Sequence, residues 1–318
     1  MSEATHMPLV SVIMPVRNEA GFIRRSLGAV LSQDYPADWM EVLVVDGMSD
    51  DATRDLVSRI ASQHQFPIIR LLDNPKRIVP SALNIGLQYA KGDIIIIIGG
   101  HSEIAPDYVR ECVQALGTSG ADCVGGQWQT VGTSRVGQAI AVAQSSPFGI
   151  GNVAYRTRRP TPGFVDTVPF GAYRRDVFER IGGFDERLGG FDTRLVRHQD
   201  YEFNVRLRQA GGRIYYTPAI QARYYSRSSF RKLARQYLEY GFWKAFVTLE
   251  NPRALAWRHL APIGLVGALA GGAVLSIALP PLRPLYAGLW LLYGLACLLM
   301  ALKEARRAGW RCLPLLPA

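Results

Sequence analysis

The 318-residue chain has only four cysteines, and no two of them form a C-x-x-C pattern. Cys112, Cys123, Cys297 and Cys312 are spread along the chain, which excludes a disulfide-rich scaffold and a zinc-ribbon site. No basic and then apolar leader opens the chain, since Met1 to Met7 is polar, so we expect the N-terminal part to stay in the cytoplasm. With 48% hydrophobic residues the chain can form a core, as one large domain or two ordinary ones.

Acidic residues are scarce in one part of the chain only. Residues 1–220 carry 23 Lys and Arg against 23 Asp and Glu, whereas residues 221–318 carry 13 against 3. The net charge of +10 therefore belongs to the C-terminal tail. A nucleic-acid-binding function is disfavoured because this basic surplus flanks apolar runs instead of covering a folded domain.

The tail contains two uncharged stretches, Leu260–Leu279 with 20 residues and Leu285–Leu302 with 18. Each is long enough to cross the ~30 Å hydrocarbon core of a bilayer as a helix. The alternative, a buried hairpin of a soluble domain, normally keeps a polar stripe that neither run has. Only Arg283 stands between the runs, so we expect both outer ends to face the cytoplasm. The outer basic residues are Arg253, Arg258, Lys303, Arg306, Arg307 and Arg311, after which the chain reads like the start of a third apolar segment.

Apolar residues between Phe230 and Ala245 recur at helical spacing, with basic residues at other positions. This pattern predicts either a basic amphipathic helix on anionic lipid or a surface helix packed on the domain. We expect three parts: a cytoplasmic domain over residues 1–220, an interfacial segment over 221–258, and a membrane part over 259–318.

Short apolar runs alternate with helical stretches in the N-terminal part. We expect strands over Leu9–Pro15, Glu41–Val45, Ile68–Leu72 and the five isoleucines Ile94–Ile98. This alternation predicts an α/β domain with a mainly parallel central sheet that binds ligands at the carboxyl ends of its strands. The chain contains neither G-x-G-x-x-G nor G-x-x-x-x-G-K, which disfavours NAD-dependent dehydrogenases, flavoproteins and P-loop enzymes.

Four motifs follow one another in a specific order. They are Ser11–Glu19, Val44–Asp51, Ser81–Gly86 with Gly92-Asp93, and Gly182–Glu186 leading into His198–Glu202. Together they resemble family-2 glycosyltransferases, which have the GT-A fold and bind nucleotide-diphosphate sugars. The basic helix and the paired apolar runs are similar to the membrane-attached branch that includes succinoglycan-biosynthesis glucosyltransferases.

The resemblance implies an inverting transfer in which Asp200 removes the proton of the acceptor hydroxyl. From the residues alone, Asp200 is as well explained as a helix cap, Asp46 as a turn residue and Arg77 as a solvated loop residue. By resemblance, the residues that bind the nucleotide sugar are Pro15, Arg17, Glu19, Asp46, Arg77, Asp93 and Gly100. Asp185 and Glu202 are expected beside the acceptor or in a lid.

The family's metal-binding motif, Asp-x-Asp or Asp-x-His, is altered here to Gly99-Gly100-His101. That motif usually holds Mg²⁺ or Mn²⁺ against the diphosphate, and hard cations prefer oxygen ligands. We expect a divalent cation held by His101, with Glu103 or Asp107 supplying a carboxylate.

Processive synthases carry a Q-x-x-R-W signature, whereas Gln236 is followed here by Tyr237-Leu238-Glu239-Tyr240. The sequence therefore favours addition of a single sugar. The resemblance implies transfer from a UDP-sugar to a polyprenyl- or lipid-linked acceptor at the membrane, in exopolysaccharide or cell-envelope glycan synthesis. The alternative is a non-catalytic subunit that binds nucleotide sugar or assembles a synthesis complex, which the altered metal motif suggests.

Overall fold

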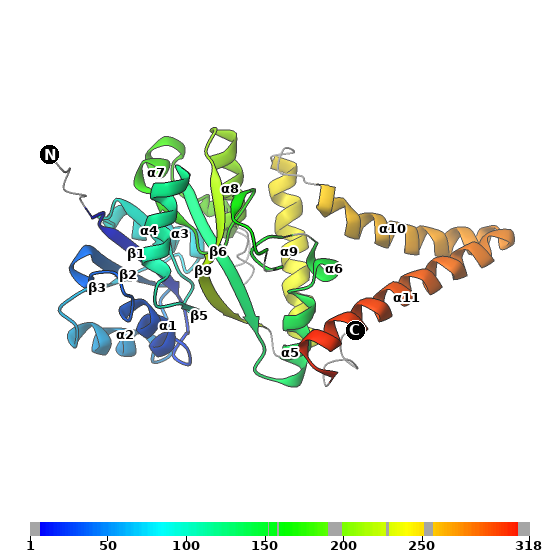
Figure 1. The fold of residues 1–318 in the computed structure, drawn as a ribbon, viewed down its shortest axis with the longest axis horizontal. Helices are drawn as coiled ribbons and strands as arrows, with labels where there is room; N and C mark the ends of the chain where they lie inside the picture. Colours follow the sequence, from blue (N-terminus) through cyan, green and yellow to red (C-terminus); the bar gives the residue numbers. More distant parts are fainter. Residues whose placement is uncertain are drawn as a thin grey trace. The chain divides into compact units, whose positions relative to one another are not determined.

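The computed structural model describes residues 7–151, 153–157, 159–189, 199–226, 229–250 and 257–310 (Figure 1). The chain divides into two compact units. The first comprises Met1–Thr130, Ala154–Tyr225 and Gln236–Trp243, and the second comprises Val131–Val153, Ser226–Arg235 and Lys244–Ala318.

The first unit is built on a nine-stranded mixed sheet with the order β3-β2-β1-β4-β8-β6-β9-β5, in which β7 pairs with β9. Four strands run parallel: β1 (Val10–Val16), β2 (Met40–Asp46), β3 (Ile68–Asp73) and β4 (Ile94–Ile97). The remaining strands are β5 (Ser102–Ile104), β6 (Cys123–Val131), β7 (Gly163–Val165), β8 (Ala172–Arg174) and β9 (Ile214–Tyr225). The predicted α/β fold with a mainly parallel sheet is confirmed, with antiparallel pairing from β8 onward.

Helices cover both faces of this sheet. One face packs on α1 (Ile23–Leu31), α2 (Thr53–Ser62) and α4 (Tyr108–Ser119). The other packs on α3 (Val79–Tyr89), α7 (Arg175–Ile181) and α8 (Gln199–Gln209). The isoleucine run explains why both faces are apolar, because side chains alternate along a strand: Ile94, Ile96 and Ile98 enter the first core, and Ile95 enters the second.

The parallel strands β1, β2 and β4 end at the same edge of the sheet, because their registers pair Val10 with both Met40 and Ile94. That edge carries the segment after Val16, the carboxylate of Asp46 and the Gly99–His101 turn. The short helices η1 (Ala37–Trp39) and η2 (Glu186–Gly189) lie in connections.

The second unit contains α5 (Arg135–Ala143), α6 (Pro147–Ile150) and a helical hairpin made of α10 (Trp257–Ala278), η4 (Pro280–Leu282) and α11 (Arg283–Ala308). The Tyr286 hydroxyl donates to the carbonyl of Leu269 at 3.1 Å, and Arg283 donates to the carbonyl of Ser276 at 3.2 Å. A Cβ on Gly272 would lie 2.8 Å from the Tyr286 ring, so the absent side chain permits this close helix contact.

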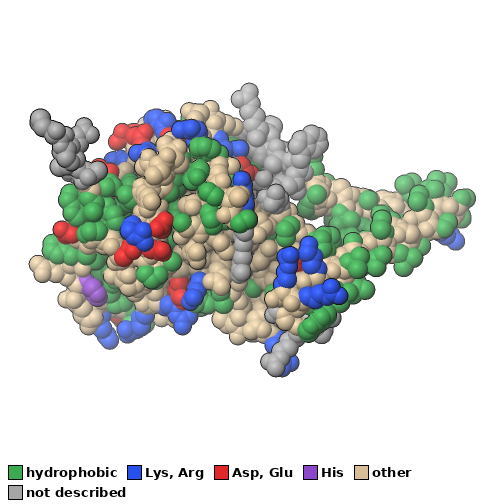
Figure 2. Space-filling model, viewed as in Figure 1, with side chains coloured by type: hydrophobic (Ala, Val, Ile, Leu, Met, Phe, Trp, Pro, Cys, Tyr) green, Lys and Arg blue, Asp and Glu red, His purple; other side chains and the backbone are tan. Residues whose placement is uncertain are grey.

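Two C-terminal segments, Leu260–Ala278 and Pro280–Arg307, are long and apolar enough to cross a membrane, each with a mean hydropathy of 2.0. Only 6% of each is buried within the protein, so their apolar side chains lack the cover that a soluble core provides. The visible face of the hairpin is largely hydrophobic in Figure 2, with Lys and Arg side chains gathered towards the end of α11.

Helix α9 (Phe230–Glu250) buries some polar side chains and exposes some large apolar ones, the reverse of a typical surface helix of a soluble protein. It buries Gln236 and Glu239, together with Trp243 and Val247. It exposes the large apolar side chains of Tyr237, Leu238, Phe242 and Leu249, and also the basic residues Arg231, Lys232 and Arg235. Exposed apolar and basic residues on one helix are the combination expected of an interfacial helix.

Candidate active site

Asp200 is the second residue of α8, a helix that the sheet holds by its buried face. Phe203 and Leu207 enter the core, and the buried amide of Asn204 accepts from the Tyr173 hydroxyl at 3.1 Å and donates to the Thr167 hydroxyl at 2.9 Å. The packing of Phe203 and Leu207 and the hydrogen bonds of Asn204 therefore hold the start of α8 in place, while Asp200 remains accessible to solvent.

The carboxylate of Asp200 has an environment suited to accepting a proton. Its Oδ1 accepts from the backbone N–H of Tyr201 at 2.9 Å. Desolvation by the surrounding protein raises the pKa of Asp200 above its usual value, although this N–H and the positive charge of Arg156 act in the opposite direction. A solvent-accessible carboxyl group with a raised pKa is the kind of group that serves as a general base.

Arg156, which no sequence motif indicated, lies within electrostatic range of Asp200 and has its side chain among three aromatic rings. The guanidinium carbon lies 5.1 Å from the ring centroid of Trp128, 5.8 Å from that of Tyr155 and 5.9 Å from that of Tyr224. We call these three rings the aromatic cage. Trp128 stacks on Tyr224 with a centroid distance of 4.5 Å and an interplanar angle of 2°. The backbone N–H of Trp128 donates to the Tyr155 carbonyl at 2.8 Å, which fixes the segment carrying Arg156 against β6.

The expected nucleotide-binding residues that follow β1 and β2 come together. The backbone N–H of Asn18 donates to the Ser49 hydroxyl at 2.9 Å, and the backbone N–H of Glu19 donates to the Thr53 hydroxyl at 2.8 Å. These bonds tie the segment containing Arg17 and Glu19, directly after Pro15 and Val16, to the loop that follows Asp46. Arg77 follows β3, is exposed and has a positive φ of 59°.

Asp46 is fully buried and already hydrogen-bonded by the protein. Its carboxylate accepts from the backbone N–H of Ser49 at 2.9 Å, from the Ser49 hydroxyl, and from Nη1 of Arg54 at 2.8 Å. The second arm of Arg54 donates to the more exposed Asp73 at 2.7 Å. Asp46 therefore has a structural role at the end of β2 in addition to any contact with a nucleotide.

Asp93 lies at the opposite edge of the sheet, so the structure does not place it beside the other nucleotide-binding candidates. It precedes β4, and its carboxylate accepts from the backbone N–H of Leu9 at 3.0 Å, just ahead of β1. A Cβ on neighbouring Gly92 would lie 2.5 Å from the backbone nitrogen of Ser11. The Gly-Asp pair serves close packing at the amino ends of the strands, whereas ligands of open α/β sheets bind at the carboxyl ends.

His101 and Glu19 are the two expected site residues whose side chains lie close enough together to share a metal ion. The Nδ1 atom of His101 lies 3.1 Å from Oε1 of Glu19, and a Cβ on Gly100 would lie 3.1 Å from Cγ of Glu19. Glu103 instead ion-pairs with Arg25 at 3.1 Å and accepts from the Tyr225 hydroxyl at 2.7 Å. Among the residues described, no group of three or more His, Cys, Asp or Glu side chains could hold a metal ion.

Asp185 and Glu202 are held in ion pairs beside the segment that leads toward Asp200. Arg187 binds the Asp185 carboxylate and lowers its pKa. Arg206 binds Glu202 and donates to the carbonyls of Ile181 and Gly183, each at 2.8 Å.

Helix α3 clamps the same loop. The Asn84 side chain accepts from the N–H of Phe184 at 2.7 Å and donates to its carbonyl at 2.9 Å. It also donates to the carboxylate of Glu186 at 3.1 Å, to which Lys76 donates as well. Together with the Asp185 and Glu202 ion pairs, these bonds fix residues 184–186 against α3 and α8.

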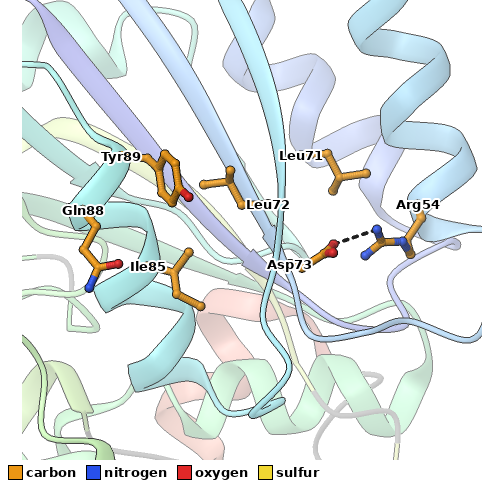
Figure 3. A pocket seen from close by; sticks show the side chains of 7 residues that line it. All are labelled: Arg54, Leu71, Leu72, Asp73, Ile85, Gln88 and Tyr89. Carbon is orange, nitrogen blue, oxygen red and sulfur yellow. Dashed lines mark hydrogen bonds and ion pairs between the residues drawn. The ribbon is translucent and has the colours of Figure 1, made fainter.

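A hollow of about 540 Å³ lies at the outer edge of the sheet. Leu71, Leu72 and Asp73 of β3, Ile85, Gln88 and Tyr89 of α3, and Arg54 of α2 line it. Figure 3 shows Arg54 and Asp73 pairing across one side of this hollow. Asp200 and His101 do not belong to its lining.

Comparison with known proteins identifies the family. Residues 11–182 match Glycosyl transferase family 2. The chain belongs to this family. It is 31% identical to the succinoglycan biosynthesis protein ExoA of Rhizobium meliloti (strain 1021) over 84% of this chain and 78% of that protein. The resemblance stated from the four motifs is thus confirmed: the chain is a family-2 glycosyltransferase enzyme, with relatives in glycan biosynthesis.

Two further relatives are informative. The chain is 29% identical to the dolichyl N-acetyl-alpha-D-glucosaminyl phosphate 3-beta-D-2,3-diacetamido-2,3-dideoxy-beta-D-glucuronosyltransferase of Methanococcus voltae, over 82% of this chain and 79% of that protein. Its fold is similar to the mannosyltransferase PcManGT from Pyrobaculum calidifontis in complex with GDP-Man and Mn²⁺. That match has a TM-score of 0.54 and 23% identity, and covers 90% of this chain and 85% of the other. This glycosyltransferase therefore has the GT-A-like architecture.

Proposed function

We propose that this family-2 enzyme moves one sugar, with inversion, from a nucleoside-diphosphate donor to a lipid-linked acceptor, and that Asp200 is its base. The observation that carries the proposal is the carboxylate of Asp200, solvent-accessible and with a raised pKa, at the start of a helix anchored to the sheet. UDP-sugars are the donors to test first.

The reaction needs one proton acceptor and one means of stabilising the leaving group. The acceptor oxygen attacks the anomeric carbon as the bond from that carbon to the diphosphate oxygen breaks on the opposite face. The hydroxyl proton passes to Asp200, and the bonding electrons leave with the nucleoside diphosphate. A carboxylate with a raised pKa accepts this proton more readily near neutral pH than an ordinary aspartate does.

The donor is expected at the carboxyl ends of β1, β2 and β4, where Glu19, Asp46 and His101 lie. His101 and Glu19 would give a cation one nitrogen and one carboxylate ligand, with diphosphate oxygens completing the site, a mixed set that suits Mn²⁺ better than Mg²⁺. A cation bound there would neutralise charge on the departing diphosphate. Glu103 is committed to Arg25 and Tyr225 and is not included in this site.

A membrane-bound acceptor is supported by the C-terminal helices and by one relative. The relative from Methanococcus voltae has a lipid phosphate, a dolichyl sugar phosphate, in the name of its reaction. Basic residues stand at the outer ends of the two apolar helices and only Arg283 at their connection, a charge pattern that favours the outer ends on the cytoplasmic side. Anchoring raises the local concentration of a membrane-confined acceptor.

The test is transfer by the full chain, purified in detergent. Labelled UDP-sugars are offered with a polyprenyl-diphosphate-linked sugar, and the anomeric configuration of the product is read by NMR. We expect one sugar added per acceptor with inverted configuration. Donor binding without transfer would favour the non-catalytic alternative, and retained configuration would exclude Asp200 as a simple base.

A further inference from the structure

The side chain of Arg156 is unusually deeply placed for a cation. The residue is 8% exposed and its guanidinium is surrounded by the aromatic cage of Trp128, Tyr155 and Tyr224. Aromatic faces attract such a cation, and they do so more strongly when water is excluded. Burial acts to lower the pKa of Arg156, but a guanidinium keeps its proton at any physiological pH, and this one also hydrogen-bonds the side chain of Tyr155.

The charge of Arg156 is not neutralised within the part of the chain that the structure describes. No described Asp or Glu forms an ion pair with it. Buried cations are normally paired with an anion, because removing a charge from water is costly. An aromatic cage lowers this cost but supplies no counter-charge, so the position suits a ligand that brings its own negative charge.

One donor of the cage lacks a hydrogen-bond partner among the described residues. The indole Nε1 of Trp128 is buried, and no described group accepts its hydrogen. Buried donors of this kind are rare unless water or a ligand completes them. The cage therefore offers a guanidinium and an indole N–H, and both are donors that an anion would satisfy.

The cage adjoins the proposed base. Asp200 lies within electrostatic range of Arg156 but is not paired with it. The cage is also connected to the edge of the sheet where the donor is expected, since the rings of Tyr224 and His101 are 6.0 Å apart. An anion at Arg156 would lie beside the base, and in an inverting transfer the base stands on the acceptor's side of the sugar, opposite the leaving diphosphate.

We infer that Arg156 and its aromatic cage bind the phosphate of the lipid-linked acceptor and so position the attacking hydroxyl at Asp200. This assignment rests on the proposed function and adds the acceptor's anchoring group to it. Arginine suits the task, because its planar fork binds phosphate oxygens in pairs and its flat face stacks on aromatic rings.

Gln236 of α9 supports the cage from behind. Its amide nitrogen donates to the Tyr224 hydroxyl at 3.3 Å and to the Tyr240 hydroxyl at 2.8 Å. The helix that exposes both basic and large apolar side chains thus also supplies hydrogen bonds to the cage. A phosphate carried on a lipid would approach from such a surface.

The experiment measures binding without turnover, so that it does not depend on the enzyme reaction. The detergent-purified full chain is titrated by calorimetry with farnesyl diphosphate, farnesol, inorganic pyrophosphate and UDP. The variants are Arg156→Met and Arg156→Lys, with Arg208→Gln as the matched control, because Arg208 is an exposed arginine of α8. Thermal unfolding of each variant is recorded alongside.

We expect farnesyl diphosphate to bind about 10- to 100-fold more weakly to Arg156→Met, with affinity for UDP unchanged. Arg156→Lys should recover part of the affinity, and Arg208→Gln should bind like the wild type. Replacing a buried unpaired cation by a long apolar side chain should leave the unfolding temperature unchanged or raise it. Wild-type binding of farnesyl diphosphate without sugar transfer would leave this site in place and reject only the proposed function.

Three results would overturn the inference. If Arg156→Met weakens UDP and not farnesyl diphosphate, the anion at Arg156 is the leaving nucleotide. If inorganic pyrophosphate binds as tightly as farnesyl diphosphate, the site takes free phosphate and not a lipid headgroup. If Arg156→Met lowers the unfolding temperature and weakens all ligands equally, the cage is only a packing element.

Discussion

Asp46 and Asp73 bind the same arginine, and this shared partner provides a matched pair of substitutions. The side chain of Asp46 is 0% exposed and that of Asp73 is 59% exposed, while both accept from Arg54. Asp46→Asn keeps the shape but turns an amide N–H₂ toward the Ser49 donors or toward Arg54. A buried charge-assisted hydrogen bond is worth about 1.5–3 kcal/mol, and facing donors add to the loss, so we expect about 2–4 kcal/mol.

Asp73→Asn should cost about 0–1 kcal/mol, because exposed ion pairs contribute little. For a domain of this size, Asp46→Asn then lowers the unfolding temperature by about 5–10 °C and Asp73→Asn by less than about 3 °C. Differential scanning fluorimetry of the detergent-solubilised full chain measures both. Equal and small shifts for the two variants would refute the structural role assigned to Asp46.

Three further predictions concern the site. Asp200 must be unprotonated to act, so kcat/KM falls as the pH drops through its raised pKa. Arg156→Gln removes a positive charge that lowers this pKa, so the acidic limb of the pH profile should move to higher pH. An unmoved limb would contradict the coupling of the two groups. Asn84→Ala breaks three hydrogen bonds to residues 184–186 and should lower the unfolding temperature by several degrees, and Asn84→Asp, which keeps the acceptor for Phe184 but turns a carboxylate oxygen toward the Phe184 carbonyl and Glu186, should lower it at least as much; an unchanged unfolding temperature in Asn84→Asp would contradict the donor role of the amide. His101→Ala should raise the Mn²⁺ concentration for half-maximal activity by about 10-fold or more, an expectation that turnover unaffected by EDTA would rule out.

The sequence predicted the fold well because its signals are local. The isoleucine run, the motifs at the ends of the first two strands and the long apolar runs each lie within a few neighbouring residues. Side-chain alternation along β4 explains why five isoleucines in a row stabilise a sheet covered on both faces.

Two of the expected site residues, Asp93 and Glu103, have protein partners that local sequence did not indicate. Spacing places Asp93 beside a strand but does not tell which edge of the sheet it reaches, and the structure puts it at the amino end. Glu103 is only two residues from His101, yet the pairing of β5 with β9 brings it to Arg25 and Tyr225. Two residues that are close in sequence need not bind the same ligand when one of them lies in a strand, because strand pairing decides which neighbours its side chain meets.

The aromatic cage could not be predicted from a motif. Trp128, Arg156 and Tyr224 come from β6, a turn and β9, and only the sheet brings them together. A single arginine after a tyrosine carries no local signal of burial. Finding such a site required the tertiary structure.

The central claim is that Asp200 takes the acceptor proton, and the most direct measurement compares two carboxylates of the same helix. Single-turnover rates are measured for Asp200→Asn and Glu202→Gln with donor and acceptor both saturating. Loss of a general base predicts a rate about 10²- to 10⁴-fold lower for Asp200→Asn, and a rate near that of the wild type for Glu202→Gln, whose carboxylate is bound by Arg206. Transfer by Asp200→Asn at a rate close to that of the wild type would contradict the account.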